Sequence, residues 1–149
     1  MLYIGIDPGQ SGGMACLHYT GFVYGHTKMP ETERDTFDWL AQFADSECFA
    51  VIEAVHSMPK QGVSSSFKFG QSYGFLRGCL IGSGMSFEQV TPQKWQKMMS
   101  CMTKGDKNVS KAKAQQLLPT LKITHATADA LLLAAYAMQL HALRGFAIA

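Results

Sequence analysis

The chain of 149 residues is long enough for one domain with a substantial core, and its formal net charge is only +2. Its apolar content of 47% and charged content of 16% exclude a disordered chain, and no apolar run reaches the roughly 18 residues that a membrane helix needs. A signal peptide is not expected because Asp7 interrupts the first apolar run, and the four cysteines form no Cys-x-x-Cys pair, so we expect a soluble cytoplasmic protein.

The charges are distributed unevenly along the chain. Residues 31–53 contain seven acidic side chains and one basic one, Arg34, whereas residues 54–122 contain ten basic side chains and two acidic ones. The second stretch would attract a polyanion such as DNA. The same lysines could also form no more than the solvated faces of helices.

The chain is predicted to begin with three strands. Residues 2–7 form an apolar run of strand length, and the Pro- and Gly-containing segment 8–13 predicts a turn after it. Residues 14–18 and 22–28 are predicted to be the next two strands, joined by a turn at Thr20-Gly21. We expect an antiparallel meander.

A helix and a second buried strand are predicted next. Residues 32–45 carry apolar side chains at helical spacing, with Thr32 as the N-cap and Asp35 three residues later in a pattern like a capping box. Residues 48–54 form a buried strand. Because a helix connects it to the first strands, we expect it to lie parallel to the strand at residues 2–7.

A long helix is predicted after a polar loop. The loop covers residues 57–66 and the helix residues 66–81, even though the helix contains Gly70, Gly74 and Gly78. These glycines recur every four residues and therefore lie on one face. Such a smooth stripe would let another backbone approach, either in the sheet or across a dimer seam.

The last third of the chain is predicted to be mainly helical. A short strand at residues 86–90 precedes a helix with Thr91 as the N-cap and Pro92 as its first residue. A basic helix at residues 107–118 and an apolar one at 124–143 follow. The order of elements predicts an α/β fold with a mixed five-stranded sheet flanked by helices.

Three acidic residues stand in apolar surroundings. Asp7 and Glu53 each end an apolar strand, and Asp129 lies within the apolar last helix. Carboxylates at the edge of a core are costly unless they are paired or bind a cation. His125 precedes Asp129 by four residues and therefore shares its helix face. If the strands are adjacent, these residues could hold Mg²⁺ or Mn²⁺, and two such ions can promote phosphodiester hydrolysis.

Each of these residues also has a purely structural interpretation. Asp7 could belong to a turn, because Pro and Gly follow it, and Glu53 could be a capping or salt-bridged acid. Asp129 could pair with a surface lysine, and His125 could be an ordinary residue at the start of a helix. The combination of the four is more informative than any one of them.

Four segments of the chain, in order, resemble the RuvC-type Holliday junction resolvases of the ribonuclease-H-like superfamily. The segments are Gly5-Ile6-Asp7-Pro8-Gly9-x-x-Gly12, Ile52-Glu53, Phe67-Lys68-Phe69-Gly70-Gln71-Ser72-Tyr73-Gly74 and Ala128-Asp129-Ala130-Leu131. The segment from Glu53 to Pro59 is most similar to the bacteriophage-encoded branch, whose members act in the host cytoplasm. The resemblance extends over nearly the whole chain and implies one ribonuclease-H-like nuclease domain at residues 1–149.

The resemblance implies an activity and an assembly. A homodimer would bind a four-way DNA junction, and each subunit would nick one strand symmetrically, leaving a 5′-phosphate and a 3′-hydroxyl. Asp7, Glu53 and Asp129 would be catalytic residues that hold two Mg²⁺ ions, with Mn²⁺ as a substitute. The long central helix would form the dimer seam.

The resemblance also implies where DNA is contacted. Phe67 or Phe69 would stack on unpaired junction bases, which is worth roughly 1–3 kcal/mol per base, although both could instead be core residues. The lysines expected near DNA are Lys68, Lys104, Lys107 and Lys111.

One position departs from the family pattern. Cellular members place their fourth ligand three residues before the last aspartate, where this chain has Ala126, which cannot bind a metal. His125, one residue earlier and on the same helix face, is the predicted fourth group, as a metal ligand or a proton shuttle.

Three other functions compete with a junction resolvase. An actin-like ATPase or sugar kinase also has a Gly-Ile-Asp-x-Gly strand, but it needs two such lobes and a much longer chain than 149 residues. A junction-binding protein with little catalytic activity is the second. A nuclease that prefers forks, flaps or other branched DNA is the third.

Overall fold

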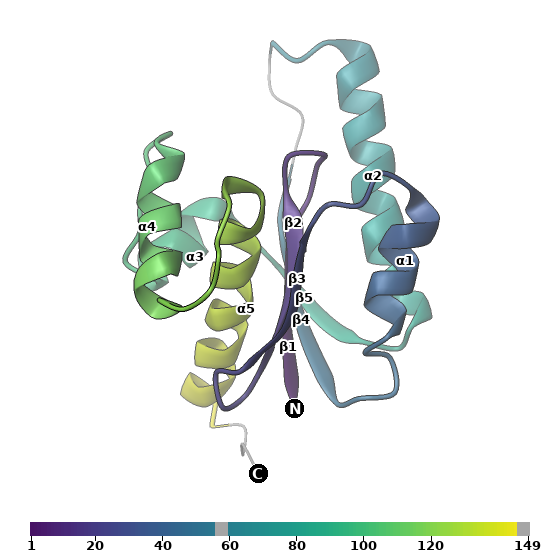
Figure 1. Ribbon diagram of the computed structural model, residues 1–149. Helices are drawn as coiled ribbons and strands as arrows, with labels where there is room; N and C mark the ends of the chain where they lie inside the picture. The colour runs from purple at the N-terminus through teal and green to yellow at the C-terminus, as the bar shows by residue number, and fades with distance from the viewer. Residues whose placement is uncertain (56–59, 146–149) are drawn as a thin grey trace.

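The computed structural model describes residues 1–55 and 60–145 (Figure 1). The elements in these ranges are, in chain order, β1 (Leu2–Asp7), β2 (Gly13–His18), β3 (Val23–Lys28), α1 (Glu33–Ala41), β4 (Cys48–Glu53), α2 (Val63–Gly82), β5 (Ser86–Val90), α3 (Pro92–Met98), α4 (Lys107–Leu117) and α5 (His125–Leu143). None of these helices is long and apolar enough to span a membrane.

The strands form one mixed sheet in the order β3-β2-β1-β4-β5. β1 and β2 are antiparallel, as are β2 and β3, which confirms the predicted meander. β4 runs parallel to β1, and β5 runs parallel to β4. The predicted parallel pairing is therefore confirmed, and β1, β4 and β5 all end at the same edge of the sheet.

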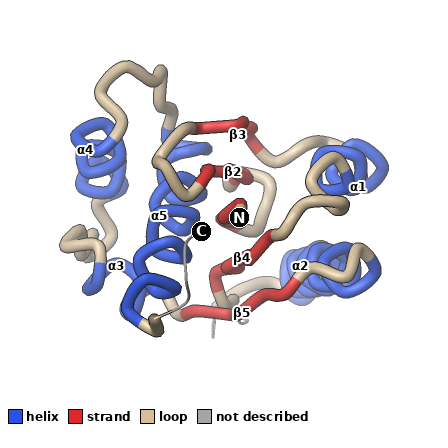
Figure 2. Tube along the Cα trace, turned by 90° about the horizontal axis from the view of Figure 1, so that it is seen from below, coloured by secondary structure: helices blue, strands red, loops and turns tan. Residues whose placement is uncertain are grey.

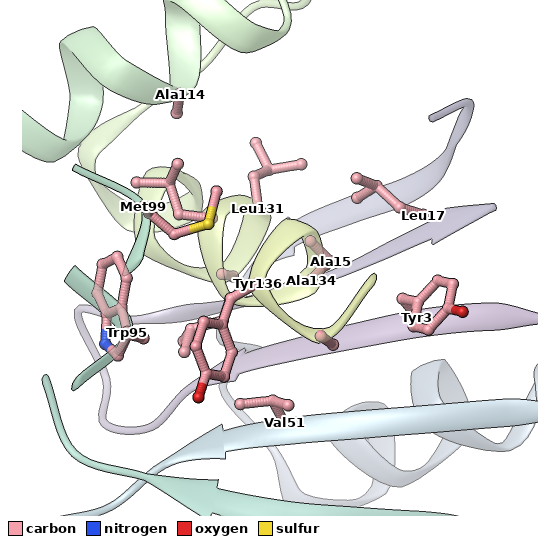
Figure 3. Close-up of a cluster of buried hydrophobic side chains, with 14 of the residues drawn as sticks. Tyr3, Ala15, Leu17, Val51, Trp95, Met99, Ala114, Leu131, Ala134 and Tyr136 are labelled. Atoms are coloured by element: carbon pink, nitrogen blue, oxygen red, sulfur yellow. The ribbon is translucent and has the colours of Figure 1, made fainter. Parts of the chain in front are cut away.

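Helices cover both faces of this sheet. Helices α3, α4 and α5 lie on one face and α1 and α2 on the other, as the view along the strands shows (Figure 2). Each face has its own buried apolar cluster, the first around Tyr3, Trp95 and Leu131 (Figure 3) and the second around Ile4, Leu40 and Leu76. The alternating side chains of β1 contribute to both clusters, so β1 is the centre of the core.

Helix α5 approaches β1 at Gly5 so closely that no side chain fits between them. A Cβ atom on Gly5 would lie 2.1 Å from the carbonyl oxygen of Ala130 and 2.4 Å from the amide nitrogen of Ala134. The glycine in the Gly5-Ile6-Asp7 motif thus allows α5 to pack directly on the strand. This packing places the first turns of α5 beside the end of β1.

Helix α2 starts earlier than predicted, and its glycine stripe faces away from the sheet. Residues 63–65, predicted to be loop, are helical, and the Ser66 amide bonds to the Gly62 carbonyl at 2.9 Å, closing the first turn. Residues 60–62 lie before the helix, as predicted, and the predicted loop residues 57–59 lie outside the described residues. Gly70, Gly74 and Gly78 are exposed, and a Cβ on any of them would meet no described atom within 4 Å. The stripe therefore does not pack on the sheet.

Capping signals marked the starts of α1 and α3 correctly, whereas the end of α1 was predicted too late. The Thr32 hydroxyl accepts the Asp35 amide at 3.0 Å, and the Thr91 hydroxyl accepts the Lys94 amide at 3.4 Å, as predicted. Helix α1 ends at Ala41 rather than at Asp45, because the next amides bond three residues back in tighter turns.

Candidate functional site

Three acidic residues from distant parts of the sequence meet at the edge where the parallel strands end. Asp7 ends β1, Glu53 ends the neighbouring strand β4, and Asp129 lies four residues into α5, which packs on β1. All three side chains line one cavity of about 940 Å³. The structure therefore brings together the three acids that the sequence singled out.

The acids affect one another electrostatically. Burial, with a further contribution from the charges of Glu53 and Asp129, raises the pKa of Asp7 from its ordinary value of 3.8 to about 8, and Lys107 opposes this increase. Burial likewise raises the pKa of Glu53, whereas its hydrogen bond to the Trp95 indole lowers it. Three ionised carboxylates can share this edge near neutral pH only if a cation compensates for their repulsion.

One carboxylate oxygen of Asp129 lacks a hydrogen-bond partner among the described residues. This oxygen is Oδ1, and it is buried. Burial raises the Asp129 pKa, and the Ser110 hydroxyl, Lys107 and His125 lower it in that order. A buried carboxylate oxygen without a partner is costly unless a cation binds it.

A divalent cation matches the chemistry of these donors. Carboxylate oxygens are the preferred ligands of Mg²⁺ and Mn²⁺, and the unpartnered Asp129 oxygen supports such a role. Within residues 1–55 and 60–145, however, no three Asp, Glu, His or Cys side chains form a group compact enough to hold one ion. The acids surround the cavity without forming a closed cage.

Basic and aromatic side chains complete the cavity lining. Lys68 and Phe69 contribute from α2, and Lys107 contributes from the first turn of α4. The Phe69 ring packs against the turn after β1, since its Cε2 atom lies 3.0 Å from where a Cβ on Gly9 would be. Phe69 is therefore a wall of the cavity, half-buried rather than part of the core.

The other residues expected to contact DNA are Phe67, Lys104 and Lys111, and none of them lines this cavity. Phe67 is 71% exposed, so its interpretation as a core residue is wrong. Lys104 lies in the loop before α4 with a φ of 48°, and Lys111 lies one turn after Lys107 on α4.

His125 is the least integrated of the four predicted catalytic residues. It is the first residue of α5 and is exposed, and the cavity lining does not include it. It is nevertheless near enough to Asp129 to lower the pKa of that carboxyl.

Two residues beside the acids escaped sequence reasoning. The fully buried Trp95 donates its indole N–H to Glu53 Oε2 at 2.6 Å across 42 positions of the chain, and Ser110 lies beside Asp129. Local sequence marks Trp95 only as an apolar residue on a helix. The contact between Trp95 and Glu53 depends on the pairing of β4 with β5, which local sequence does not reveal.

Comparisons with known proteins identify the fold. No protein-family model matches the chain, and no curated protein matches its sequence. Among solved structures, RuvC of Thermus thermophilus matches with a TM-score of 0.66 and 16% identity, covering 97% of this chain and 97% of that one. The T. thermophilus RuvC structure in complex with a Holliday junction substrate matches with a TM-score of 0.64 and 16% identity, covering 97% of this chain and 96% of that one.

The chain has a RuvC-type fold. The mixed five-stranded sheet flanked by helices is that of the ribonuclease-H-like proteins, which confirms the predicted fold class. The sequence resemblance based on four short segments is thus confirmed at the level of fold. In this RuvC-type fold, the cavity with Asp7, Glu53 and Asp129 lies at the edge where the parallel strands end.

Proposed function

We propose that this protein is a divalent-metal-dependent endonuclease that resolves four-way DNA junctions. The observation that carries the proposal is the meeting of Asp7, Glu53 and Asp129 at one cavity of a RuvC-type fold. One of the matching structures is RuvC with a Holliday junction substrate, which supports branched DNA as the substrate class. The domain that carries this activity is residues 1–149.

In this proposal the acids hold two Mg²⁺ ions, which Mn²⁺ can replace. Asp7, whose pKa is raised by the charges of both other acids, would hold the ions together with Glu53 and Asp129. His125 serves as the fourth group. Bound ions of this kind activate a water molecule and stabilise the leaving oxygen of a phosphodiester.

The basic and aromatic side chains bind and orient the DNA. Lys68 and Lys107 line the cavity with the acids and would contact the phosphate to be cleaved or its neighbours. Lys104 and Lys111 would extend this basic surface along the DNA backbone. Phe67 and Phe69, on the first turns of α2, would stack on unpaired bases at the junction.

The dimer seam of this proposal is the exposed glycine stripe of α2. Because Gly70, Gly74 and Gly78 have open space beside them, a second copy of the helix could approach its backbone closely. A two-fold arrangement of this kind would present two cavities to a four-way junction and would allow symmetric nicking.

The Asp7→Asn variant tests the proposal on a synthetic four-way junction with Mg²⁺. We expect cleavage to be abolished while junction binding survives, because the substitution removes a charge and leaves the side-chain volume unchanged. Glu31→Gln is the matched control, since Glu31 lines the same cavity outside the group of three acids. Cleavage by Asp7→Asn at the wild-type rate, or equal loss in the control, would contradict the assignment.

A junction-binding protein with weak catalysis is the second candidate function. Two observations favour it: the absence of a compact three-ligand group among the described residues and the position of His125 outside the cavity lining. A cleavage assay of the wild type with Mg²⁺ and Mn²⁺ separates the two candidates. Using four-way junctions, forks and flaps in the same assay also tests the preference for branched substrates.

A further inference from the structure

A buried tryptophan contacts one of the proposed metal ligands. Trp95 is 0% exposed, and its Nε1 donates to Glu53 Oε2 at 2.6 Å. An indole has a single polar group, which can only donate, so this bond uses its full capacity. Hydrogen bonds to a carboxylate are roughly twice as strong as those between neutral groups. The contact therefore restrains Glu53 effectively.

The chain builds this contact from the register of two parallel strands. Glu53 is paired with Val90, and the Ala54 amide bonds to the Val90 carbonyl at 2.7 Å. Thr91, the next residue, caps α3, so the first turn of α3 begins beside the end of β4. Trp95 lies one turn further along α3, and its indole N–H points back to Glu53.

Helix α3 is held firmly at its other end too. The Cys101 amide bonds to the Gln96 carbonyl at 2.9 Å, and the Thr103 amide donates to the Gln96 side chain at 3.3 Å. Trp95 itself packs in the cluster that includes Met99 and Tyr136 (Figure 3). The donor that Glu53 meets is thus fixed by packing, as outer groups that orient metal ligands commonly are.

We propose that Trp95 is a positioning residue that holds Oε2 of Glu53 and leaves the other carboxylate oxygen available in the cavity to bind a divalent cation. This inference rests on the proposed function, because it assigns Glu53 to a metal. A tryptophan that only fills the core would contribute to folding without affecting the affinity for the metal. The two roles therefore differ in a measurable quantity.

The first experiment measures Mn²⁺ binding to Trp95→Phe by calorimetry, together with junction cleavage as a function of Mn²⁺ concentration. Loss of an outer hydrogen bond to a metal ligand is expected to weaken Mn²⁺ binding about 10- to 100-fold. The control is Trp39→Phe on α1, which lies on the opposite face of the sheet (Figure 2). Trp39 is half-buried, and its ring centroid lies 5.1 Å from that of Phe43. We expect the Mn²⁺ affinity of this control to equal that of the wild type.

The second experiment works even if Trp95→Phe fails to fold. In the Trp39→Phe protein, the only indole N–H resonance in the NMR spectrum is that of Trp95. We expect Glu53→Gln to move this resonance upfield, since a neutral amide is a weaker acceptor, and Mg²⁺ to perturb it in the protein that retains Glu53. A resonance that responds to neither change would overturn the inference.

The outcomes also separate this inference from the function on which it rests. If the wild type binds Mn²⁺ and cleaves junctions, and folded Trp95→Phe does both equally well at every Mn²⁺ concentration, only the role of Trp95 is wrong. If the wild type does not bind Mn²⁺, the proposed nuclease is wrong and the positioning role falls with it.

Discussion

Helices α5 and α2 have similar lengths, 19 and 20 residues, and lie on opposite faces of the same sheet, yet they bury very different parts of their surface (Figure 1). Ten residues of α5 are buried, whereas α2 buries three, Leu76, Cys79 and Leu80. The N-terminal part of α2 extends beyond the sheet (Figure 1), and Phe67 near its start is exposed.

The difference separates a helix that builds the core from a helix whose surface is largely open. α5 is apolar on nearly all sides, packs backbone to backbone on β1 and holds Asp129 beside the other acids. α2 contacts the core near its end and leaves its glycine stripe open. We therefore expect substitutions near α5 to affect folding and metal binding, and substitutions on α2 to affect association with DNA or a second copy.

The largest contrast is expected from the same substitution, glycine to alanine, in the two regions. Gly5→Ala places a methyl group within 2.1 Å of the α5 backbone and should lower the free energy of unfolding by about 3 kcal/mol or more. Gly74→Ala meets no described atom within 4 Å and should raise the free energy of unfolding of the single subunit by roughly 0.5–1 kcal/mol. Urea unfolding measures both. If both substitutions changed the free energy of unfolding equally and in the same direction, the surroundings of Gly5 and Gly74 would not differ as the structure describes.

A charge on the glycine stripe tests the proposed use of α2. In a two-fold seam, Gly74→Glu would bring two like charges together, and we expect dimerisation to weaken about 100-fold without a change of fold. Sedimentation with and without junction DNA measures this. Gln116→Glu, an exposed position on α4, adds the same charge elsewhere and should have no effect. An unchanged dimer in the Gly74 variant would place the seam on another surface.

The stability of the α5 side should depend on pH through Asp7. Its pKa is 3.8 ordinarily and about 8 in the folded protein, so the folded state binds the extra proton and the wild type loses stability as the pH rises from 4 to 8. In metal-free buffer, Asp7→Asn should therefore be more stable than the wild type at pH 8, by about 1 kcal/mol or more, and nearly equal at pH 4. Added Mg²⁺ should raise the melting temperature of the wild type only.

Thermal denaturation at the two pH values measures this effect. Asp38→Asn on α1 is the control, because a substitution at this exposed side chain should change stability by less than about 0.5 kcal/mol. A wild type that is more stable than Asp7→Asn at pH 8 without metal would show that the burial of Asp7 is offset by other contacts.

The smallest effect is expected at the aromatic residues of α2. Phe67→Ala and Phe69→Ala should each reduce junction cleavage about fivefold, because each removes a stacking surface worth roughly 1 kcal/mol, while the fold changes little. Phe22→Ala is the control, since Phe22 is also exposed but lies at the opposite end of the sheet from Asp7. A loss of thermal stability as large as the loss of activity would show that Phe69 is a core residue after all.

Local patterns predicted most of the elements because their signals are short-range. Strands β1 and β5 have the predicted bounds, and the caps at Thr32 and Thr91 are present. The start of α2 was missed because its first turn contains three consecutive serines, which resemble a loop in composition. Periodicity likewise indicates that the three glycines of α2 share a face, but not what that face meets.

The sequence alone determined the order of the elements and the candidate acids, since Asp7, Glu53 and Asp129 stand out against apolar neighbours wherever they lie in space. Only the tertiary structure decided that these acids share a cavity, that Trp95 bonds to Glu53 and that His125 does not line the cavity. These relations depend on strand register and on the packing of α5 against Gly5. Both arise from contacts between residues far apart in the chain, to which local propensity and periodicity are insensitive.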